Sequence, residues 1–462
     1  MRITPAHAMA VLTISVIASM TGCSSAGGDT STGAAPSART AGALPAGPAA
    51  AWPTYGGSTR RTDVATASPA GEPRIAWRAR LDGAVYGQPL LVGSLVIAAT
   101  ENDSVYALTA ATGRIVWQTH LGSPVPMADL PCGDIFPLGI TSTPVYDQAN
   151  GLVYALAETA GYHHVLTGIS VTSGAIKVER DIPTPDGHPR YDQQRSALAI
   201  EDGRVYIAFG GLYGDCGPYR GSIVGAPLSG SGPLISYVVP TAREGAIWGT
   251  AGPVIAADGT LFVSTGNGSA NSTSFDGSDA ITALSPSLRR TGFFAPATWL
   301  DDSRNDLDLG SAQPALVGNG MLVADGKNGN AYLLSAGHLG GVGGQLAKAS
   351  VCDAYGGTAV SGGTVYEPCA SGGIAAVSTS GSQIHVLWRG PSNAAGSPVV
   401  GGGAVWVIDW SRGTLYELDP ATGTPMHTLS LGTTLPHFAS MSMSGTHAYL
   451  GTNDGVTAVT GA

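Results

Sequence analysis

A short phrase recurs along this chain of 462 residues, and its clearest copy is Val105–Trp117 (VYALTAATGRIVW). Each copy is an apolar run that ends at a turn, and we take the apolar residue before the turn as an anchor. The eight anchors are Leu108, Ile169, Leu228, Leu284, Leu334, Val377, Leu418 and Val459. They span 351 positions in seven steps, so the period is about 50 residues, which is typical of solenoids and propellers.

Each repeat contains the signals of four β-strands. Runs such as Pro89–Ala99 and Ala251–Thr265 have β-branched residues on both sides of a Gly-containing turn, which indicates a hairpin. The anchor run adds a third strand, and a fourth follows with Trp117 or Trp388. Four antiparallel strands per repeat make one propeller blade. The repeats therefore predict an all-β protein, an eight-bladed propeller.

The two ends of the chain are expected to close the ring together. The last repeat stops at Ala462, just after its third strand, so its outer strand is missing. An unassigned strand, Arg74–Arg80, precedes the first repeat, and its Trp77 matches Trp117. Pairing this N-terminal strand with the last blade would leave neither edge open.

The composition agrees with this architecture and excludes one class of partner. The 67 glycines and 30 prolines supply the tight turns of a propeller. Charged residues are only 12%, the formal net charge is −10, and basic residues do not cluster. Nucleic acid is therefore not expected as a partner, because phosphate binding needs clustered Lys and Arg. We expect a monomer.

The N-terminus is typical of an export signal. Ala8–Met20 is apolar but too short to span a membrane, and it is followed by Cys23 in a sequence that resembles a bacterial lipobox. Residues 1–23 are therefore predicted to be a lipoprotein signal with Cys23 as the lipidated residue. The alternative is a plain secretory signal with an accidental Cys. Residues 24–50 are predicted to be a disordered linker, and residues 51–462 the propeller.

Apart from Cys23, the chain has four cysteines, which suggests two disulfides in an exported protein. Three connectivities exist, and the favoured pairs are Cys132–Cys216 and Cys352–Cys369, because each pair then falls in adjacent repeats. Zinc is the alternative, but no C-x-x-C spacing supports it.

The repeats, with the opening Trp52-Pro53-Thr54-Tyr55-Gly56-Gly57, resemble those of the pyrroloquinoline quinone (PQQ) repeat propellers. This family contains two kinds of protein. One kind is the dehydrogenases that bind PQQ and calcium on the central axis and oxidise alcohols or sugars. The other is non-catalytic propellers that bind protein partners at the outer membrane. Fold alone does not separate the two.

The resemblance implies candidate residues for a quinone site. Trp248 resembles the Trp on which the quinone stacks, and Lys327 resembles the cation that contacts it. Asp306 and Asp308 form a D-x-D that resembles the motif of the catalytic base. A flat quinone needs an aromatic surface, a cation and a carboxylate base at its reactive carbonyl.

The resemblance also implies two calcium ligands. Asn267 lies in a T-G-N that is similar to the calcium-binding motif of the dehydrogenases, and Glu158 lies where they keep a calcium-binding Glu. Oxygen atoms of this kind are the ligands that calcium prefers.

Several features depart from the dehydrogenases. The adjacent cysteines that cover the cofactor are missing, and Gly268–Ala270 replaces the aromatic and Pro residues expected after T-G-N. All the candidate residues also suit turns, loops or blade packing. A non-catalytic binding module without a cofactor is therefore the first choice, with a protein or small ligand at the propeller face. The alternative is a PQQ- and calcium-dependent dehydrogenase. In either case the lipid would hold the protein on the cytoplasmic membrane's outer face or on an outer membrane.

Other catalytic patterns are weaker. His163 and His164 form an isolated pair that predicts a loop. The sequence contains neither a G-x-S-x-G nucleophile motif nor a Gly-Lys-Ser/Thr phosphate-binding motif.

Overall fold

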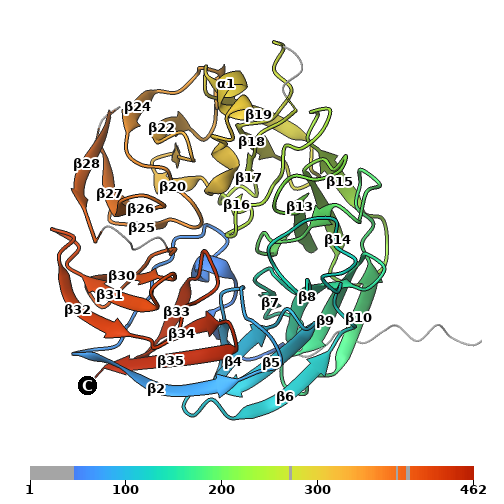
Figure 1. Ribbon diagram of the computed structural model, residues 1–462, viewed down its shortest axis with the longest axis vertical. Coiled ribbons are helices and arrows are strands. Elements are labelled where there is room, and N and C mark those ends of the chain that lie inside the picture. Colours follow the sequence, from blue (N-terminus) through green and yellow to red (C-terminus); the bar gives the residue numbers. More distant parts are fainter. Residues whose placement is uncertain (1–45, 270–272, 381–382, 392–395, 462) are drawn as a thin grey trace, which may run out of the picture. The chain divides into compact units, whose positions relative to one another are not determined.

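Eight antiparallel sheets of four main strands surround a central axis, as predicted (Figure 1). This computed structural model describes residues 46–461 except 270–272, 381–382 and 392–395. The predicted signal 1–23, with Cys23, and most of the linker 24–50 lie outside the described residues. Structure begins slightly before residue 51, the predicted start of the propeller. There the Gly47 amide donates to the Gln148 carbonyl.

The blades follow one another along the chain, each running from an inner to an outer strand. Blade one consists of β3 (Leu90–Val92), β4 (Leu95–Ala99), β5 (Ser104–Thr109) and β6 (Ile115–His120). Blade two consists of β7 (Val145–Asp147), β8 (Leu152–Thr159), β9 (His163–Ser170) and β10 (Ile176–Asp181). Blade three consists of β12 (Ala199–Glu201), β13 (Arg204–Gly211), β14 (Ser222–Pro227) and β15 (Ile235–Val238). Blade four consists of β16 (Val254–Ile255), β17 (Leu261–Thr265), β18 (Ala280–Leu284) and β19 (Arg290–Ala295).

The second half of the ring repeats this order. Blade five consists of β20 (Ala315–Gly318), β21 (Met321–Ala324), β22 (Asn330–Ser335) and β24 (Ala347–Ser350). Blade six consists of β25 (Ala359–Ser361), β26 (Thr364–Cys369), β27 (Gly373–Ser380) and β28 (Gln383–Arg389). Blade seven consists of β29 (Val399–Gly401), β30 (Ala404–Asp409), β31 (Thr414–Leu418) and β32 (Pro425–Ser430). Blade eight consists of β33 (Met441–Ser444), β34 (His447–Thr452), β35 (Gly455–Gly461) and β2 (Pro73–Arg80).

A few short elements lie outside this scheme. They are β1 (Ala50–Trp52), β11 (Asp192–Gln193), β23 (Gly341–Val342), the helix α1 (Trp299–Arg304) and the 3-10 turns η1 (Tyr55–Gly57) and η2 (Leu309–Ser311). The helix α1 was not predicted. It lies in the polar stretch of sequence before blade five. None of the described helices is long and apolar enough to cross a membrane.

The repeated phrase builds the contact between neighbouring blades. Its anchors lie in the third strand of each blade or, for Leu228, directly after it. In blade one, the outer-strand Trp117 donates from Nε1 to the Val171 carbonyl of blade two at 2.9 Å. A Cβ on Gly174, which has φ +72°, would lie 2.9 Å from that indole. The turn glycine is therefore needed both for its backbone conformation and for the Trp of the preceding blade.

The ring closes through the N-terminal strand, which confirms the prediction. β2 pairs antiparallel with β35 from Pro73 opposite Gly461 to Arg80 opposite Gly455. Trp77 of β2 makes the same inter-blade contact as Trp117, since its Nε1 donates to the Ala110 carbonyl of blade one at 3.0 Å. One strand thus completes blade eight and joins it to blade one.

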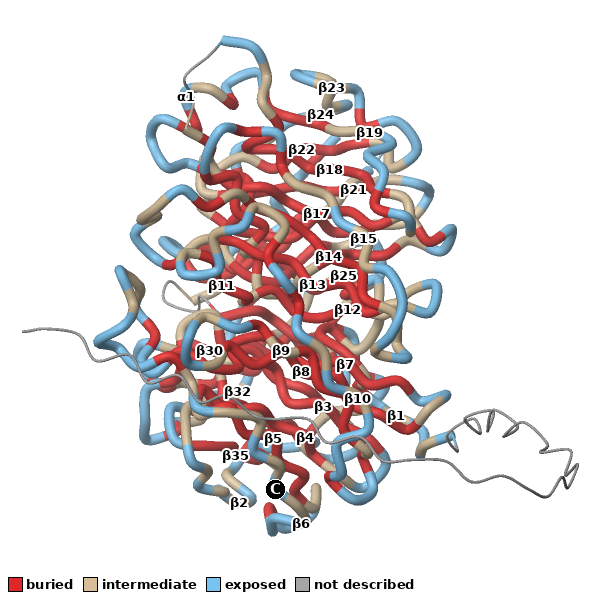
Figure 2. Tube along the Cα trace, turned by 90° about the vertical axis from the view of Figure 1, so that its right-hand side faces the viewer, coloured by how far each residue is buried: buried red, intermediate tan, exposed pale blue. Residues whose placement is uncertain are grey.

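The apolar core is divided among the blade interfaces rather than concentrated in one place. Buried strand segments recur through the side view of the ring (Figure 2). One cluster combines Leu90 and Ile97 of blade one with Val153 and Ile169 of blade two. Each blade therefore buries its faces against its two neighbours, as expected for a repeat protein.

Residues 52–65, which we call the plug, run along the inner strands. The plug carbonyls of Pro53, Thr59 and Thr62 accept hydrogen bonds from inner strands of blades two, four and six, respectively. Arg61 donates to blade three, and the backbone of Ala65 bonds to blade seven. The plug therefore contacts inner strands on several sides of the ring, and its trace lies near the axis (Figure 1).

Two disulfides join the four predicted cysteines in the favoured pairs. Cys352 follows blade five and pairs with Cys369 at the end of β26 in blade six. Cys132, in the loop between blades one and two, pairs with Cys216 in the β13–β14 connection of blade three. We call residues 121–144, which carry Cys132, the stapled loop. Its Val125, Ile135 and Leu138 form a small apolar cluster with Leu212, which follows β13 of blade three.

Candidate functional site

Two sets of connections meet at one face of the ring. In an antiparallel blade, the start of the inner strand and the end of the second strand lie at the same edge. Trp248 and Asp308 lie in segments that lead into inner strands, whereas Glu158, Asn267 and Lys327 end or follow second strands. Asp306 lies in the same segment as Asp308, so all six predicted residues belong to one face, which we call the loop face.

Three of the predicted residues contact one another. Trp248 Nε1 donates to Asp308 Oδ2 at 2.9 Å, and Lys327 Nζ lies 3.0 Å from Asp308 Oδ1. The same ammonium is 5.5 Å from the centre of the Trp248 ring and 2.6 Å from Asp306 Oδ1. Asp306 itself is exposed at the surface, with φ +54°. Trp248, Asp308 and Lys327 thus form an indole–carboxylate–ammonium group.

Burial and neighbouring polar or charged groups shift the pKa values of Asp308 and Lys327 in opposite directions. Burial raises the pKa of Asp308 above its ordinary value, although Lys327 and the Trp248 N–H lower it. Burial lowers the pKa of Lys327, but Asp308 and Asp306 more than reverse this and leave it above its ordinary value. Gly266 of the T-G-N motif makes room for the carboxylate, since a Cβ there would lie 2.6 Å from Asp308 Oδ2.

Of the two predicted calcium ligands, Glu158 makes its contacts outside this group, whereas Asn267 directly follows Gly266, which lies beside Asp308. Glu158 is buried at the end of β8, where its Oε1 accepts from the Gln194 amide at 2.5 Å and its Oε2 lies 3.5 Å from His164 Nε2. The prediction of a loop at His163 and His164 was wrong, because both begin β9 and His164 is buried against Glu158. Asn267 is half-buried, and its carbonyl accepts from the Gly245 amide at 2.7 Å.

Aromatic residues that the sequence did not single out extend the group across the axis. Tyr355 and Phe438 stack with ring centres 6.0 Å apart, and both lie within 6.4 Å of the Trp248 ring. His437 meets Phe438 edge-on at 4.9 Å, and Tyr86 meets His437 edge-on at 5.3 Å. They come from segments before blades one, six and eight, so only the closed ring brings them together.

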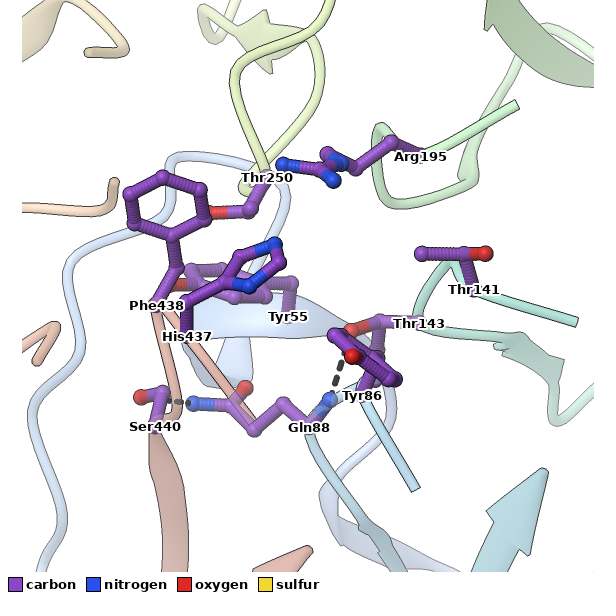
Figure 3. A pocket seen from close by; sticks show the side chains of 11 residues that line it. Tyr55, Tyr86, Gln88, Thr141, Thr143, Arg195, Thr250, His437, Phe438 and Ser440 are labelled. Carbon is purple, nitrogen blue, oxygen red and sulfur yellow. Dashed lines mark hydrogen bonds between the residues drawn. The ribbon is translucent and has the colours of Figure 1, made fainter. Parts of the chain in front are cut away.

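Next to these rings lies a pocket with about 340 Å³ of empty space, part of it open to solvent. We call it the axial pocket (Figure 3). It is lined by the aromatic residues Tyr55, Tyr86, His437 and Phe438, by Arg195, and by Gly87, Gln88, Thr141, Thr143, Thr250 and Ser440. Tyr55 comes from the plug, so the segment that bonds to the inner strands also contributes to the wall of this pocket.

The stapled loop supplies a carboxylate to this region. Asp134 Oδ1 lies 3.7 Å from Arg195 Nη2, and its Oδ2 lies 3.9 Å from His437 Nε2. Burial and the nearby Arg195 lower the pKa of His437 to about 4, although Asp134 opposes them. His437 is therefore neutral at ordinary pH, and Arg195 is the charged partner of Asp134.

The arrangement does not fit a calcium-bound quinone. Asp308 Oδ2 accepts a hydrogen bond from Trp248 and Oδ1 faces the Lys327 ammonium at 3.0 Å, so a calcium ion at this carboxylate would meet the positive charge of Lys327, and protonation would weaken the ion pair. Glu158 is hydrogen-bonded elsewhere, and the Trp248 ring already has aromatic neighbours. Among the described residues, no group of three or more His, Cys, Asp or Glu side chains is placed to hold a metal ion. We derive no catalytic step through PQQ.

Fold and loop face together define a PQQ-repeat propeller. The chain belongs to the family described as outer membrane protein assembly factor BamB, whose model matches residues 57–214 and 247–429. A search of curated protein sequences found no match.

Solved structures of both kinds of PQQ-repeat protein share this fold. BamB from Moraxella catarrhalis is 15% identical, with a TM-score of 0.58 over 82% of this chain and 97% of its own. Quinohemoprotein alcohol dehydrogenase ADHIIG from Pseudomonas putida HK5 is 15% identical, with a TM-score of 0.68 over 88% of this chain and 76% of its own. A europium-containing methanol dehydrogenase is also 15% identical, with a TM-score of 0.63 over 86% of this chain and 88% of its own. At this identity the likeness concerns the fold alone.

Proposed function

We propose that this protein is a non-catalytic binding module, exported and lipid-anchored through Cys23, that recognises its partner with the loop face. The observation that carries this proposal is the engagement of Asp308 by Trp248 and Lys327. A dehydrogenase of this family would need that carboxylate for calcium or for a substrate proton. The family model, described as an assembly factor, agrees with a binding role.

The exposed part of the stapled loop gives the loop face an apolar element. Met127 and Phe136 are 63% and 47% exposed, and Tyr213, beside Cys216, is 70% exposed. Exposed large apolar side chains on an otherwise polar rim are typical of protein-binding surfaces. The disulfide Cys132–Cys216 holds the segments that carry them together.

A PQQ titration tests the non-catalytic role. We expect no calcium-dependent binding of PQQ at tens of micromolar, which corresponds to about −6 to −7 kcal/mol, in calorimetry or in the absorbance of the quinone. Stoichiometric, calcium-dependent binding that is lost in Asp308→Ala and kept in Asp301→Ala would contradict the proposal. Asp301 is a suitable control because it is an exposed Asp of α1, close in sequence to Asp308.

Substitution of Cys23 tests the anchor. We expect the wild-type protein in the membrane fraction and Cys23→Ser either released or unprocessed, because two acyl chains hold a protein stably where one does not. Fractionation of cells followed by mass spectrometry of the mature N-terminus measures both results. Ser24→Ala is the control and should stay membrane-bound. A processed Cys23→Ser protein that remains on the membrane would show that another feature holds it there.

A further inference from the structure

Arg195 is a nearly buried cation with unusually few partners. Its side chain is 11% exposed. A guanidinium carries five N–H donors, and among the described residues no acceptor lies within hydrogen-bond distance of them. The nearest carboxylate oxygen is Asp134 Oδ1 at 3.7 Å, and the ring of Phe438 lies 5.6 Å away.

The other acidic groups near Arg195 do not replace these missing bonds. Glu101 and Glu158 both act electrostatically on the guanidinium. Burial raises the pKa of Glu101 to about 8, so this carboxyl is mostly uncharged at neutral pH. Glu158 is turned to the Gln194 amide and to His164. Buried charges are normally paired and hydrogen-bonded, and the donors of Arg195 that Asp134 does not engage face the axial pocket, where water or a ligand can accept from them.

The surroundings of Arg195 match the carboxylate end of an organic ligand. The guanidinium lines the axial pocket together with aromatic rings and hydroxyl groups (Figure 3). Phe438 and Tyr86 offer apolar surface next to the cation, while Thr141, Thr143 and Thr250 offer hydrogen bonds. An Arg fork binds both oxygens of a carboxylate in one plane.

We propose that the axial pocket binds the carboxylate of a ligand through Arg195, with the apolar part of that ligand against Phe438 and Tyr86. The inference rests on the binding role proposed above and names the chemistry of that binding. The ligand is either a small free acid or the C-terminal carboxylate of a partner polypeptide. Asp134 acts as a built-in competitor, since its carboxylate approaches the same guanidinium from the stapled loop.

Ligand-observed NMR on the full-length protein tests this proposal with phenylacetate as the probe and phenylacetamide as the uncharged control. Phenylacetate should bind and phenylacetamide should not. Arg195→Gln should weaken phenylacetate at least tenfold, about 1.4 kcal/mol. Arg80→Gln is the matched control, because Arg80 is an 85% exposed Arg on β2, and it should bind as the wild type does.

Asp134→Asn gives an independent measurement that keeps Arg195 in place. Removing the competing charge should tighten phenylacetate two- to tenfold. Circular dichroism melts would show whether either substitution unfolds the protein. Equal binding of acid and amide, an unchanged affinity in Arg195→Gln, or no binding even by Asp134→Asn would overturn the proposal.

The peptide acetyl-Gly-Gly-Phe, compared with its C-terminal amide, distinguishes a small free acid from the C-terminal carboxylate of a polypeptide as the ligand. Tighter binding of the free peptide acid than of phenylacetate indicates a polypeptide C-terminus, whereas weaker binding indicates a small acid. The PQQ titration is read separately through Asp308→Ala, so failure of the binding-module proposal and failure of the carboxylate site give different results.

Discussion

Deletion of residues 1–80 is expected to abolish the cooperative fold. The deletion removes β2, which pairs with β35 along its whole length and joins blade eight to blade one through Trp77. It also removes the plug, whose hydrogen bonds reach strands around the axis. A typical domain is stable by only about 5–15 kcal/mol, and these losses together exceed that margin. Circular dichroism melts and sedimentation would show a broad transition and association through the open edge of β35.

Two control samples test whether the loss of β2 and the plug, rather than the loss of residues 1–45, causes this result. Deletion of residues 1–45 leaves β2 and the plug in place, and it should melt like the full chain. Addition of a peptide of residues 46–80 to the long deletion should restore a cooperative melt, because it supplies the missing strand and plug in trans. A monomeric long deletion with an unchanged melting temperature would show that the ring does not depend on this strand.

Replacement of Arg61 by Ala is expected to lower the free energy of unfolding by about 3–5 kcal/mol. Arg61 is only 1% exposed, and it donates to the carbonyls of Tyr55, Leu198 and Pro253 at 2.9, 3.0 and 3.2 Å, and to the Thr54 hydroxyl. Its loss would leave the buried carbonyls of Tyr55 and Pro253 without a donor, whereas the Leu198 carbonyl keeps the Thr54 hydroxyl. Each buried acceptor without a donor costs about 1–3 kcal/mol.

Guanidinium-induced unfolding followed by Trp fluorescence measures the effect. Arg60→Ala is the matched control, because Arg60 is the exposed neighbour in sequence and should change stability by no more than about 0.5 kcal/mol. A loss below about 1 kcal/mol in Arg61→Ala would mean that water replaces the guanidinium and that the plug holds without it.

Periodic features of this chain could be predicted from the sequence. The turn glycine and the outer-strand Trp recur at three blade contacts, where Trp77, Trp117 and Trp388 each pack on a turn glycine of the next blade, and this constraint is visible as a repeat. The closing strand was predictable because Trp77 has the same position in its strand as Trp117 has in the fourth strand of the first repeat. Trp248, Asp308 and Lys327 were predictable as a group only through the resemblance, which preserves their order in the chain.

The rest of the site could not be predicted, because its residues have no common period. Arg195, Tyr355 and Phe438 lie in irregular segments of different blades, and their proximity exists only after eight blades close around the axis. The helix α1 was missed because six residues are too few to show a helical period. Glu158 lies near the end of β8, and its contact with His164 of the next strand, β9, could not be predicted from their positions in the sequence.

The contact of β2 with β35 also determines when this protein becomes complete. Residues near position 75 are synthesised early and their partners near position 459 are synthesised last, so the N-terminal strand waits for nearly the whole chain. Pairings of such long sequence separation form slowly. Until then both edges are exposed, and a nascent chain needs protection from association. A chain interrupted anywhere before β35 would therefore lack the partner of β2. Closure of the ring thus depends on the last residues to be synthesised.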